Sequence, residues 1–441
     1  MHTLKAQEPM RSELSVQLER AVLAGVILPE MQHEDEQPLS ELERLAETAG
    51  ARVVGRIFQN AKALESTYAM GKGKAETLLA LADEAGADAV IFDNDLTPGQ
   101  IRNLERLLKR KVIDRSELIL DIFASRAQTH QARLQVELAQ LEYTMPRLQS
   151  MWSHLEGIAG GIGMTGGLGT RGPGERQLES DRRLARKRKV KLREEIAEIG
   201  ERKAREVKSR RAEFNISLVG YTNAGKSTLM NALTGAGTLV EDKLFATLDT
   251  CTRVWHLDDH RKALVSDTVG FIQQLPHRLV ASFHATLEEA RNADLLLHVV
   301  DAAHPRCEEQ INAVDRVLEE IGCHGKPVIM VFNKIDAVLD FSLVTRLRLE
   351  RPAGVQISAA TGQGLDSLTA AVAQMLSERE TVVDIRTHCG NGKLLAFLAE
   401  NGRVISQEYA GDSMMLKAAI LPQHLGRLRR LAGSEIVTTT A

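Results

Sequence analysis

The chain has 441 residues, and because a domain commonly spans about 150 residues, this length predicts more than one hydrophobic core. Hydrophobic residues make up 43% and charged residues 26% of the chain, a balance that excludes disordered and collagen-like proteins. The formal net charge of −3 does not by itself suggest a polyanionic partner. Four widely separated cysteines without a CxxC pair argue against a disulfide framework or a zinc site, and fit a reducing compartment.

The start of the chain, MHTLKAQEPMRSELS, lacks the basic and long apolar regions of a signal peptide. Apolar runs such as 295–300 are too short to cross a bilayer. We therefore expect a cytoplasmic protein that is neither secreted nor inserted into a membrane.

The first part of the chain alternates strand-like and helix-like segments. An apolar run at 21–28 (AVLAGVIL) precedes a segment, 39–48, that places leucines on one helical face. The alternation then recurs as strand-like 51–58, helical 74–85, strand-like 87–92, helical 98–109 and strand-like 111–113. This pattern predicts an open, mostly parallel α/β sheet, which we expect to form an N-terminal domain over residues 1–130.

A helical hairpin is predicted next, over residues 131–212. Apolar residues in its first arm repeat at a 4-3-4-3 spacing, which is the seam of a helix that packs on another helix: Leu134, Leu138, Leu141, Met145 and Leu148. A matching stripe in the second arm consists of Leu192, Ile196 and Ile199. Because the connection between the arms is short, we expect them to pair in antiparallel orientation.

The connection between the two arms is rich in glycine. Residues 157–174 read GIAGGIGMTGGLGTRGPG and hold 9 of the 33 glycines in the chain. A flexible linker is the plain interpretation of such a stretch. Two features favour a functional loop instead: its position at the tip of a hairpin, and apolar and basic residues where a passive spacer would carry serine, namely Ile162, Met164, Leu168 and Arg171.

The second arm is strongly basic. Residues 171–211 carry 16 Lys and Arg against 8 Asp and Glu, a net charge of +8 in a chain whose total is −3. A solvated helix face is the commonest cause of such a run, but a one-sign cluster on a protruding hairpin suits phosphate backbones. With 2 tryptophans and 4 tyrosines in the chain, we expect recognition of RNA through phosphates or shape rather than base stacking.

A phosphate-binding loop follows the hairpin. The strand-like run 214–219 leads into GYTNAGKS and a helix-like segment, which is the GxxxxGK[ST] pattern in its required context. We predict that backbone N–H groups surround the β-phosphate, that Lys226 reaches the β- and γ-phosphates, and that the Ser227 hydroxyl ligates Mg²⁺. The predicted contacts here are Gly220, Tyr221, Thr222, Asn223, Ala224, Gly225, Lys226, Ser227 and Thr228.

The base is expected to be read at NKID, which follows the strand-like run 328–332. The carboxylate of Asp336 can accept hydrogen bonds from the ring N–H and the amino group of guanine, whereas adenine would leave that charge desolvated and unpaired. GTP is therefore predicted over ATP as the substrate. The expected base pocket comprises Asn333, Lys334, Ile335 and Asp336, completed by Ser358, Ala359 and Ala360.

Two segments are expected to sense the γ-phosphate. In DTVG, which holds Asp267, Thr268, Val269 and Gly270, the aspartate would hold Mg²⁺ through water and the Gly270 N–H would bond the γ-phosphate. The other segment is FATLD, which holds Phe245, Ala246, Thr247, Leu248 and Asp249. Both sets of contacts vanish when the γ-phosphate leaves, so the surrounding loops should switch from order to disorder.

Thr247 is the predicted second protein ligand of Mg²⁺, with Thr250 and Thr252 as nearby competitors for that role. The predicted metal ligands are therefore Ser227, Thr247 and Asp267, and the predicted catalytic residues are Lys226, Thr247 and Gly270.

In this order the motifs resemble the translation-factor class of P-loop GTPases. The segments GYTNAGKST, DTVGFI and GGIGMTGGLGTRGPGERQLE are similar to the HflX family of ribosome-associated GTPases, with a resemblance that covers residues 20–380. The resemblance implies a Mg²⁺-dependent GTPase that binds the large ribosomal subunit and its rRNA, reaches toward the peptidyl-transferase region with the hairpin loop, and splits or rescues stalled ribosomes. We further expect a monomer when the protein is free.

One position departs from the general small-GTPase pattern. Phe271 follows DTVG, where many such enzymes carry a glutamine that orients the attacking water. A phenylalanine side chain can neither donate nor accept that hydrogen bond. We therefore expect slow intrinsic hydrolysis, with the missing group supplied by a partner such as the ribosome or by another loop; activators of this kind accelerate hydrolysis by about 10³- to 10⁵-fold.

We expect the GTPase domain to span residues 213–379, followed by a small C-terminal α/β domain at 380–441 to which the pattern assigns no role. Two alternatives stay open. A GTPase of large-subunit assembly would share every motif above. The other alternative is an RNA-remodelling ATPase or a purely structural RNA-binding protein. The ATPase would need its ATP site outside the GTPase domain, in the N-terminal unit. GKGK (71–74) before a helix could hold a phosphate there, although a basic turn without a ligand explains that motif more simply.

Overall fold

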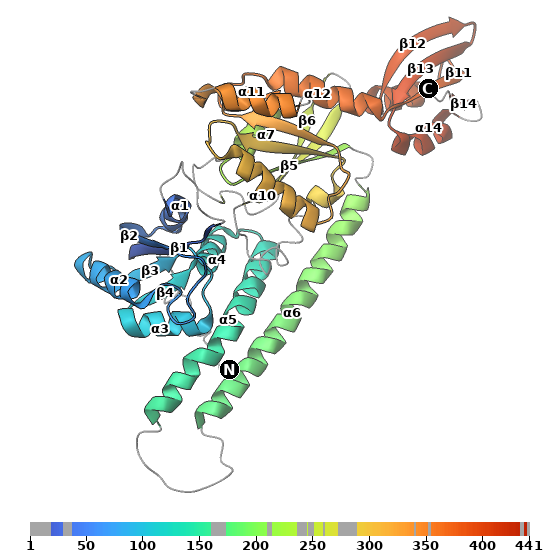
Figure 1. Ribbon diagram of the computed structural model, residues 1–441. Helices are drawn as coiled ribbons and strands as arrows, with labels where there is room; N and C mark the ends of the chain where they lie inside the picture. Colours follow the sequence, from blue (N-terminus) through green and yellow to red (C-terminus); the bar gives the residue numbers. More distant parts are fainter. Residues whose placement is uncertain are drawn as a thin grey trace. The chain divides into compact units, whose positions relative to one another are not determined.

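The computed structural model describes residues 19–29, 38–159, 173–209, 214–235, 245, 251–258, 261–271, 289–338, 341–351, 354–432 and 436–438. The chain folds into two compact units. Unit 1 comprises residues 1–199 with 242–249 and 274–284, and unit 2 comprises the remainder. Figure 1 labels many of the helices and strands named below.

Unit 1 contains a four-stranded parallel sheet in the order β2-β1-β3-β4. Its strands are β1 (Arg20–Ile27), β2 (Arg52–Asn60), β3 (Ala89–Phe92) and β4 (Lys111–Asp114), and its helices are α1 (Ser40–Ala49), α2 (Lys72–Glu84), α3 (Pro98–Leu108) and α4 (Arg115–Arg126). Seven consecutive residues of β1 are buried, as expected of a central parallel strand covered on both faces. The predicted open parallel α/β sheet is confirmed.

Two long helices, α5 (His130–Ala159) and α6 (Pro173–Ser209), lie side by side and form the predicted hairpin (Figure 1). Leu134, Leu138 and Leu192 are buried in its seam, with Leu141, Ile196 and Ile199 packed against them. The tip residues 160–172 lie outside the described part of the chain.

Ion pairs between the two arms accompany the apolar seam. Glu137 of α5 pairs with Arg188 of α6 at 2.7 Å, and Glu142 pairs with both Lys189 at 3.0 Å and Arg193 at 2.7 Å. Part of the positive charge of the second arm is therefore neutralised within the hairpin, a pairing that the net charge of the segment did not reveal.

Unit 2 contains a six-stranded sheet in the order β10-β9-β8-β5-β7-β6, parallel except for β6. Its strands are β5 (Phe214–Gly220), β6 (Cys251–His256), β7 (Lys262–Asp267), β8 (Leu295–Asp301), β9 (Val328–Asn333) and β10 (Val355–Gln356). The helices that the site uses are α7 (Lys226–Thr234), α10 (Cys307–Glu320), the 3₁₀ turn η2 (Ile335–Ala337), α11 (Phe341–Glu350) and α12 (Leu365–Glu378).

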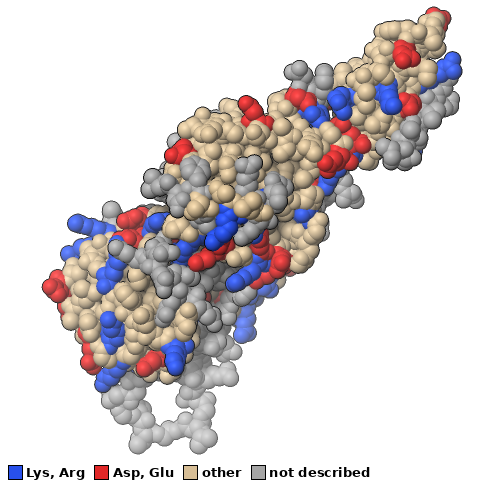
Figure 2. Space-filling view, turned by 45° about the horizontal axis from the view of Figure 1, so that its top comes forward, with Lys and Arg blue, Asp and Glu red and all other residues tan. Residues whose placement is uncertain are grey.

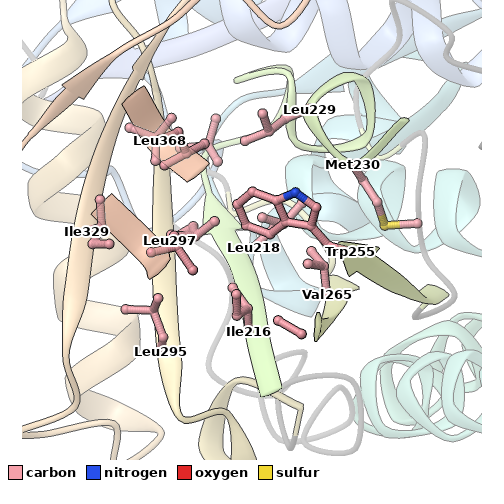
Figure 3. Packing of buried hydrophobic residues seen from close by; sticks show 14 of the residues in the cluster. Ile216, Leu218, Leu229, Met230, Trp255, Val265, Leu295, Leu297, Ile329 and Leu368 are labelled. Carbon is pink, nitrogen blue, oxygen red and sulfur yellow. The ribbon is translucent and has the colours of Figure 1, made fainter. Parts of the chain in front are cut away.

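One apolar core holds this sheet against its helices. Figure 3 shows Trp255 of β6 lying among Leu229 and Met230 of α7 and Val265 of β7, with Ile216 and Leu218 of the central strand beside them. All of these side chains are at most 2% exposed. The sheet edge that carries the phosphate loop therefore rests on a rigid, close-packed base.

The last part of unit 2 is a separate four-stranded antiparallel sheet in the order β12-β13-β11-β14. Its elements are β11 (Thr381–His388), α13 (Gly392–Asn401), β12 (Gly402–Ala410), β13 (Ser413–Ile420), η3 (Pro422–His424), α14 (Leu425–Ala432) and β14 (Ile436–Thr438). The succession β-α-β-β-α-β with this order is the ferredoxin-like arrangement, with its own apolar core. Among the helices that the structure describes, none is long and apolar enough to cross a bilayer.

Candidate nucleotide site

The phosphate loop connects β5 to α7, and two of its glycines are sterically required. At Gly220, where φ is +151°, a Cβ atom would lie 2.2 Å from the carbonyl oxygen of Val299. At Gly225, where φ is +90°, it would lie 2.3 Å from Nδ2 of Asn333. The glycine pattern therefore exists because the loop passes directly against the strand β8 and against the asparagine of NKID.

Lys226 begins α7 and is 6% exposed. Its Nζ donates hydrogen bonds to the carbonyl oxygens of Gly220 at 3.0 Å and Tyr221 at 2.8 Å. Burial lowers the pKa of this lysine to about 8, and the nearby carboxylate of Asp267 partly opposes the shift. A phosphate group placed within the loop would favour the charged ammonium form, since an adjacent anion raises a lysine pKa.

Ser227 and Asp267, two of the predicted Mg²⁺ ligands, lie within hydrogen-bond distance of each other. The Ser227 Oγ donates a hydrogen bond of 2.6 Å to Oδ2 of Asp267, which ends β7. A hydroxyl and a carboxylate oxygen are the hard donors that Mg²⁺ prefers, so the residues present fit that ion. The third predicted ligand, Thr247, lies outside the described residues, as do Ala246, Leu248, Asp249 and the competitor Thr250. Thr252 is described: its hydroxyl is 2.9 Å from that of Ser266.

The DTVG segment lies directly on the phosphate loop. The Phe271 N–H donates to the Gly220 carbonyl oxygen at 3.1 Å, and the Thr222 N–H donates to the Phe271 carbonyl oxygen at 2.7 Å. A Cβ atom at Gly270 would lie 2.8 Å from Cγ2 of Thr222 and 3.1 Å from Nζ of Lys226. Only a glycine can therefore occupy the position predicted to contact the γ-phosphate.

The predicted base-reading residues are held from two sides. Asn333 donates from Nδ2 to the Ala224 carbonyl oxygen at 2.9 Å and accepts at Oδ1 from the Ala359 N–H, also at 2.9 Å. The Ile335 N–H donates to the Ile357 carbonyl oxygen at 3.2 Å. Asn333 thus ties the phosphate loop to the SAA segment, while the exposed Asp336 stands in η2 beside it.

Reasoning from sequence missed two contacts of the predicted site residues. Phe245, predicted to touch the nucleotide, is 2% exposed, and its ring packs edge-to-face on that of Phe123 with centroids 4.7 Å apart. Asp301, the last residue of β8, pairs with Lys334 at 2.7 Å. An acidic residue that ends the strand preceding the NKID strand is the one signal that could have indicated this pair.

Three family models match the chain in succession. They are described as GTP-binding GTPase N-terminal (residues 36–124), GTP-binding GTPase Middle Region (126–210) and 50S ribosome-binding GTPase (215–334). The chain is 42% identical over 421 residues to the GTPase HflX of Caldanaerobacter subterraneus subsp. tengcongensis, a match that covers 95% of this chain and 94% of that protein. The chain belongs to the HflX family. It is also 45% identical over 379 residues to the GTPase HflX of Escherichia coli (strain K12), covering 85% and 87% of the two chains.

Among solved structures, this HflX family member is similar to a GTP-binding protein from the hyperthermophilic archaeon Sulfolobus solfataricus in complex with GDP. The two share 25% sequence identity with a TM-score of 0.42, over 81% of this chain and 99% of that one. Membership of the HflX family, together with the match to a GTPase domain, identifies the chain as a GTP-hydrolysing enzyme.

The structure brings most of the predicted site residues of this HflX family member to one sheet edge. The phosphate loop, Asp267 to Gly270, and the NKID and SAA segments all follow the carboxyl ends of β5, β7, β9 and β10. Ligands of open parallel sheets commonly bind at such an edge. Some of the described residues predicted for the site have side chains engaged by residues outside it: Phe245 packs on Phe123, and the Thr268 hydroxyl donates to the Leu218 carbonyl oxygen at 2.6 Å.

Proposed function

We propose that this HflX family member binds the large ribosomal subunit in its GTP-bound form and splits or rescues stalled ribosomes. The observation that carries the proposal is the union, in one chain, of a GTPase domain that matches a model described as 50S ribosome-binding GTPase and a two-helix hairpin with a glycine-rich tip. We place the protein in the cytoplasm, as a monomer when free.

The hairpin supplies the surface proposed to contact rRNA. Arg188, Lys189 and Arg193 are engaged by glutamates of α5, whereas Arg183, Arg186 and Lys187 are exposed on α6. Figure 2 shows Lys and Arg interspersed with Asp and Glu over the described part of the face in view. The hairpin has a local excess of positive charge, whereas charges of both signs are mixed over that face. The hairpin is therefore better suited to contact a phosphate backbone.

In the proposed GTP complex, Mg²⁺ would be held by Ser227 and Thr247 directly and by Asp267 through water, and it supplies neutralisation of phosphate charge. Lys226 binds the β- and γ-phosphates, and the Gly270 N–H bonds the γ-phosphate. Asp336 selects guanine over adenine. Loss of the γ-phosphate removes the contacts of Thr247 and Gly270, so the loops around them relax and affinity for the ribosome falls.

Hydrolysis in the free protein is proposed to be slow. The side chain of Phe271 cannot orient the attacking water, and its main chain is bonded to the phosphate loop. A group from the ribosome would supply what is missing, and activators of this kind accelerate hydrolysis by about 10³- to 10⁵-fold.

Sedimentation with mature ribosomes tests the proposal. With a non-hydrolysable GTP analogue, we expect free subunits to be released and the protein to travel with the large subunit; with GDP we expect little of either. Replacing residues 157–174 by an equally long Gly-Ser segment, which keeps the hairpin closed, should abolish release while nucleotide affinity stays near that of the unmodified protein.

Other outcomes would contradict the proposal. Retention only on precursor particles would make the protein an assembly GTPase, and ATP-dependent binding would make it an RNA-remodelling ATPase. Identical binding to ribosomes with GTP analogue, with GDP and without nucleotide would remove the switch altogether.

A further inference from the structure

We propose that Asp301 is a positioning residue of the guanine pocket, which holds Lys334 so that the lysine stem forms a wall for the base. The inference rests on the proposed use of Asn333 to Asp336 as the base pocket. Asp301 lies outside the four nucleotide motifs and ends the strand β8, next to the strand β9 that leads into Asn333.

Both carboxylate oxygens of Asp301 are engaged. Oδ1 accepts the Ala303 N–H at 3.1 Å, and Oδ2 accepts Nζ of Lys334 at 2.7 Å. The Ala302 N–H also donates to the Asn333 carbonyl oxygen at 2.9 Å, which fixes the two strand ends to each other. The carboxylate is therefore held in one orientation before the lysine reaches it, a condition that exposed ion pairs rarely meet.

Lys334 has an unusual backbone conformation, and the direction of its side chain decides whether it can line the base pocket. Its φ is +61°, in the left-handed region that non-glycine residues seldom occupy. Asn333 is fixed on one side by Ala224 and Ala359, and η2 with Asp336 begins on the other. A lysine at this point has four rotatable bonds, and the ion pair with Asp301 selects one direction among them.

The ion pair is partly shielded from solvent. The Asp301 and Lys334 side chains are 17% and 31% exposed. With its ammonium group anchored, the aliphatic stem of Lys334 is free to lie against the flat face of a base beside Asp336. Asp301 itself touches no nucleotide, so it acts only through the lysine. Its contribution should be the same for any purine, whereas that of Asp336 depends on the groups that guanine carries.

Nucleotide dissociation from the full-length chain tests this role. Asp301→Asn keeps an oxygen for the Ala303 N–H and removes the charge that holds Lys334. We expect a fluorescent GDP analogue to dissociate about tenfold faster from this variant, because a charge-assisted hydrogen bond is lost. GDP and IDP should be affected equally, and KM for GTP should rise far more than kcat falls. The matched control is Glu308→Gln, which breaks the ion pair between Glu308 and Arg346 on neighbouring helices. It should change neither the GDP dissociation rate nor the kinetics of GTP hydrolysis.

A double-mutant cycle separates positioning from a general structural role. In Lys334→Met, which keeps an apolar stem and lacks the ammonium group, the further change Asp301→Asn should have no effect on dissociation. Equal acceleration by Asp301→Asn in both backgrounds, or none in either, would overturn the inference. The inference would also be overturned if Asp301→Asn lowered the melting temperature of the nucleotide-free protein by an amount that accounts for its loss of GDP affinity.

Asp336→Asn distinguishes failure of this inference from failure of the proposed pocket. If Asp336→Asn leaves the preference for GDP over ADP unchanged, the pocket itself is wrong. Suppose instead that this preference collapses while GDP leaves the Asp301→Asn variant as slowly as it leaves the unmodified protein. The proposed pocket is then supported, and Asp301 has no positioning role in it.

Discussion

Phe271 has a structural role at this site and no chemical one. Its ring is 2% exposed, and its N–H and C=O both bond the phosphate loop, at Gly220 and Thr222. A polar residue here would have to bury its polar group without an assured partner, or break the two main-chain bonds to reach solvent. The position therefore stabilises the loop and does not supply a group for hydrolysis.

Phe271→Gln is expected not to create the missing catalytic group. Burial of an amide at this position should lower the free energy of unfolding by about 1 to 3 kcal/mol. The intrinsic rate of GTP hydrolysis should stay the same or fall. Single-turnover hydrolysis and chemical denaturation measure the two effects, with Phe271→Leu as the control that keeps an apolar side chain. An intrinsic rate raised tenfold or more by glutamine would show that the position is catalytic after all.

At the scale of elements, the hairpin is stabilised by contacts separate from those of the nucleotide site. Its seam is a small apolar cluster of its own, formed by Leu134, Leu138 and Leu192 with partly buried neighbours, and is distinct from the clusters under the two parallel sheets. Among the described hairpin residues this cluster has three buried members, so a cavity at one of them removes a large share of its apolar contact.

Leu192→Ala should therefore loosen the hairpin without affecting nucleotide binding. Leu192 is fully buried, so we expect the change to cost about 2 to 5 kcal/mol, felt as faster hydrogen exchange along α5 and α6. Leu184→Ala, at a position of the same helix that is 61% exposed, is the matched control and should leave exchange unchanged. Weaker GDP binding in Leu192→Ala alone would mean that the hairpin and the GTPase domain are coupled more tightly than their separate cores indicate.

Periodicity in the sequence predicted the hairpin and its seam because that signal is local to each helix. The ion pairs Glu137 to Arg188 and Glu142 to Arg193 were not predictable, since they depend on which turns of the two helices meet. The same limit applies to the site. The loop glycines and NKID follow from local pattern, whereas Asp301 reaches Lys334 only because the sheet order places β8 beside β9.

At the scale of the whole molecule, each of the two units buries a group whose pKa is shifted from its usual value. In unit 1, burial followed by the neighbouring Asp114 raises the pKa of Glu117 to about 7, against the opposing charge of Arg147, which pairs with it at 2.9 Å. In unit 2, burial lowers the pKa of His298 in β8 below its usual value of 6.5, although Asp315 of α10 opposes the shift. The two shifts have opposite consequences for stability.

Unit 1 and unit 2 should therefore respond to pH in opposite directions. The folded form of Glu117 binds its proton more tightly than the unfolded form, so its contribution is present below about pH 4.5 and is lost, on the order of 1 to 3 kcal/mol, as the pH rises through about 7. The unfolded form of His298 binds its proton more tightly, so unit 2 loses stability as the pH falls below 6.5.

Calorimetry at about pH 5.5 and about pH 8 should show two transitions that move in opposite senses. Glu117→Gln should reduce the movement of the first transition and His298→Leu that of the second, to which the buried Lys226, with its pKa lowered to about 8, adds a movement in the same direction. Two transitions that move together in the unmodified protein, or that keep their movement in these variants, would show that other groups control the pH response.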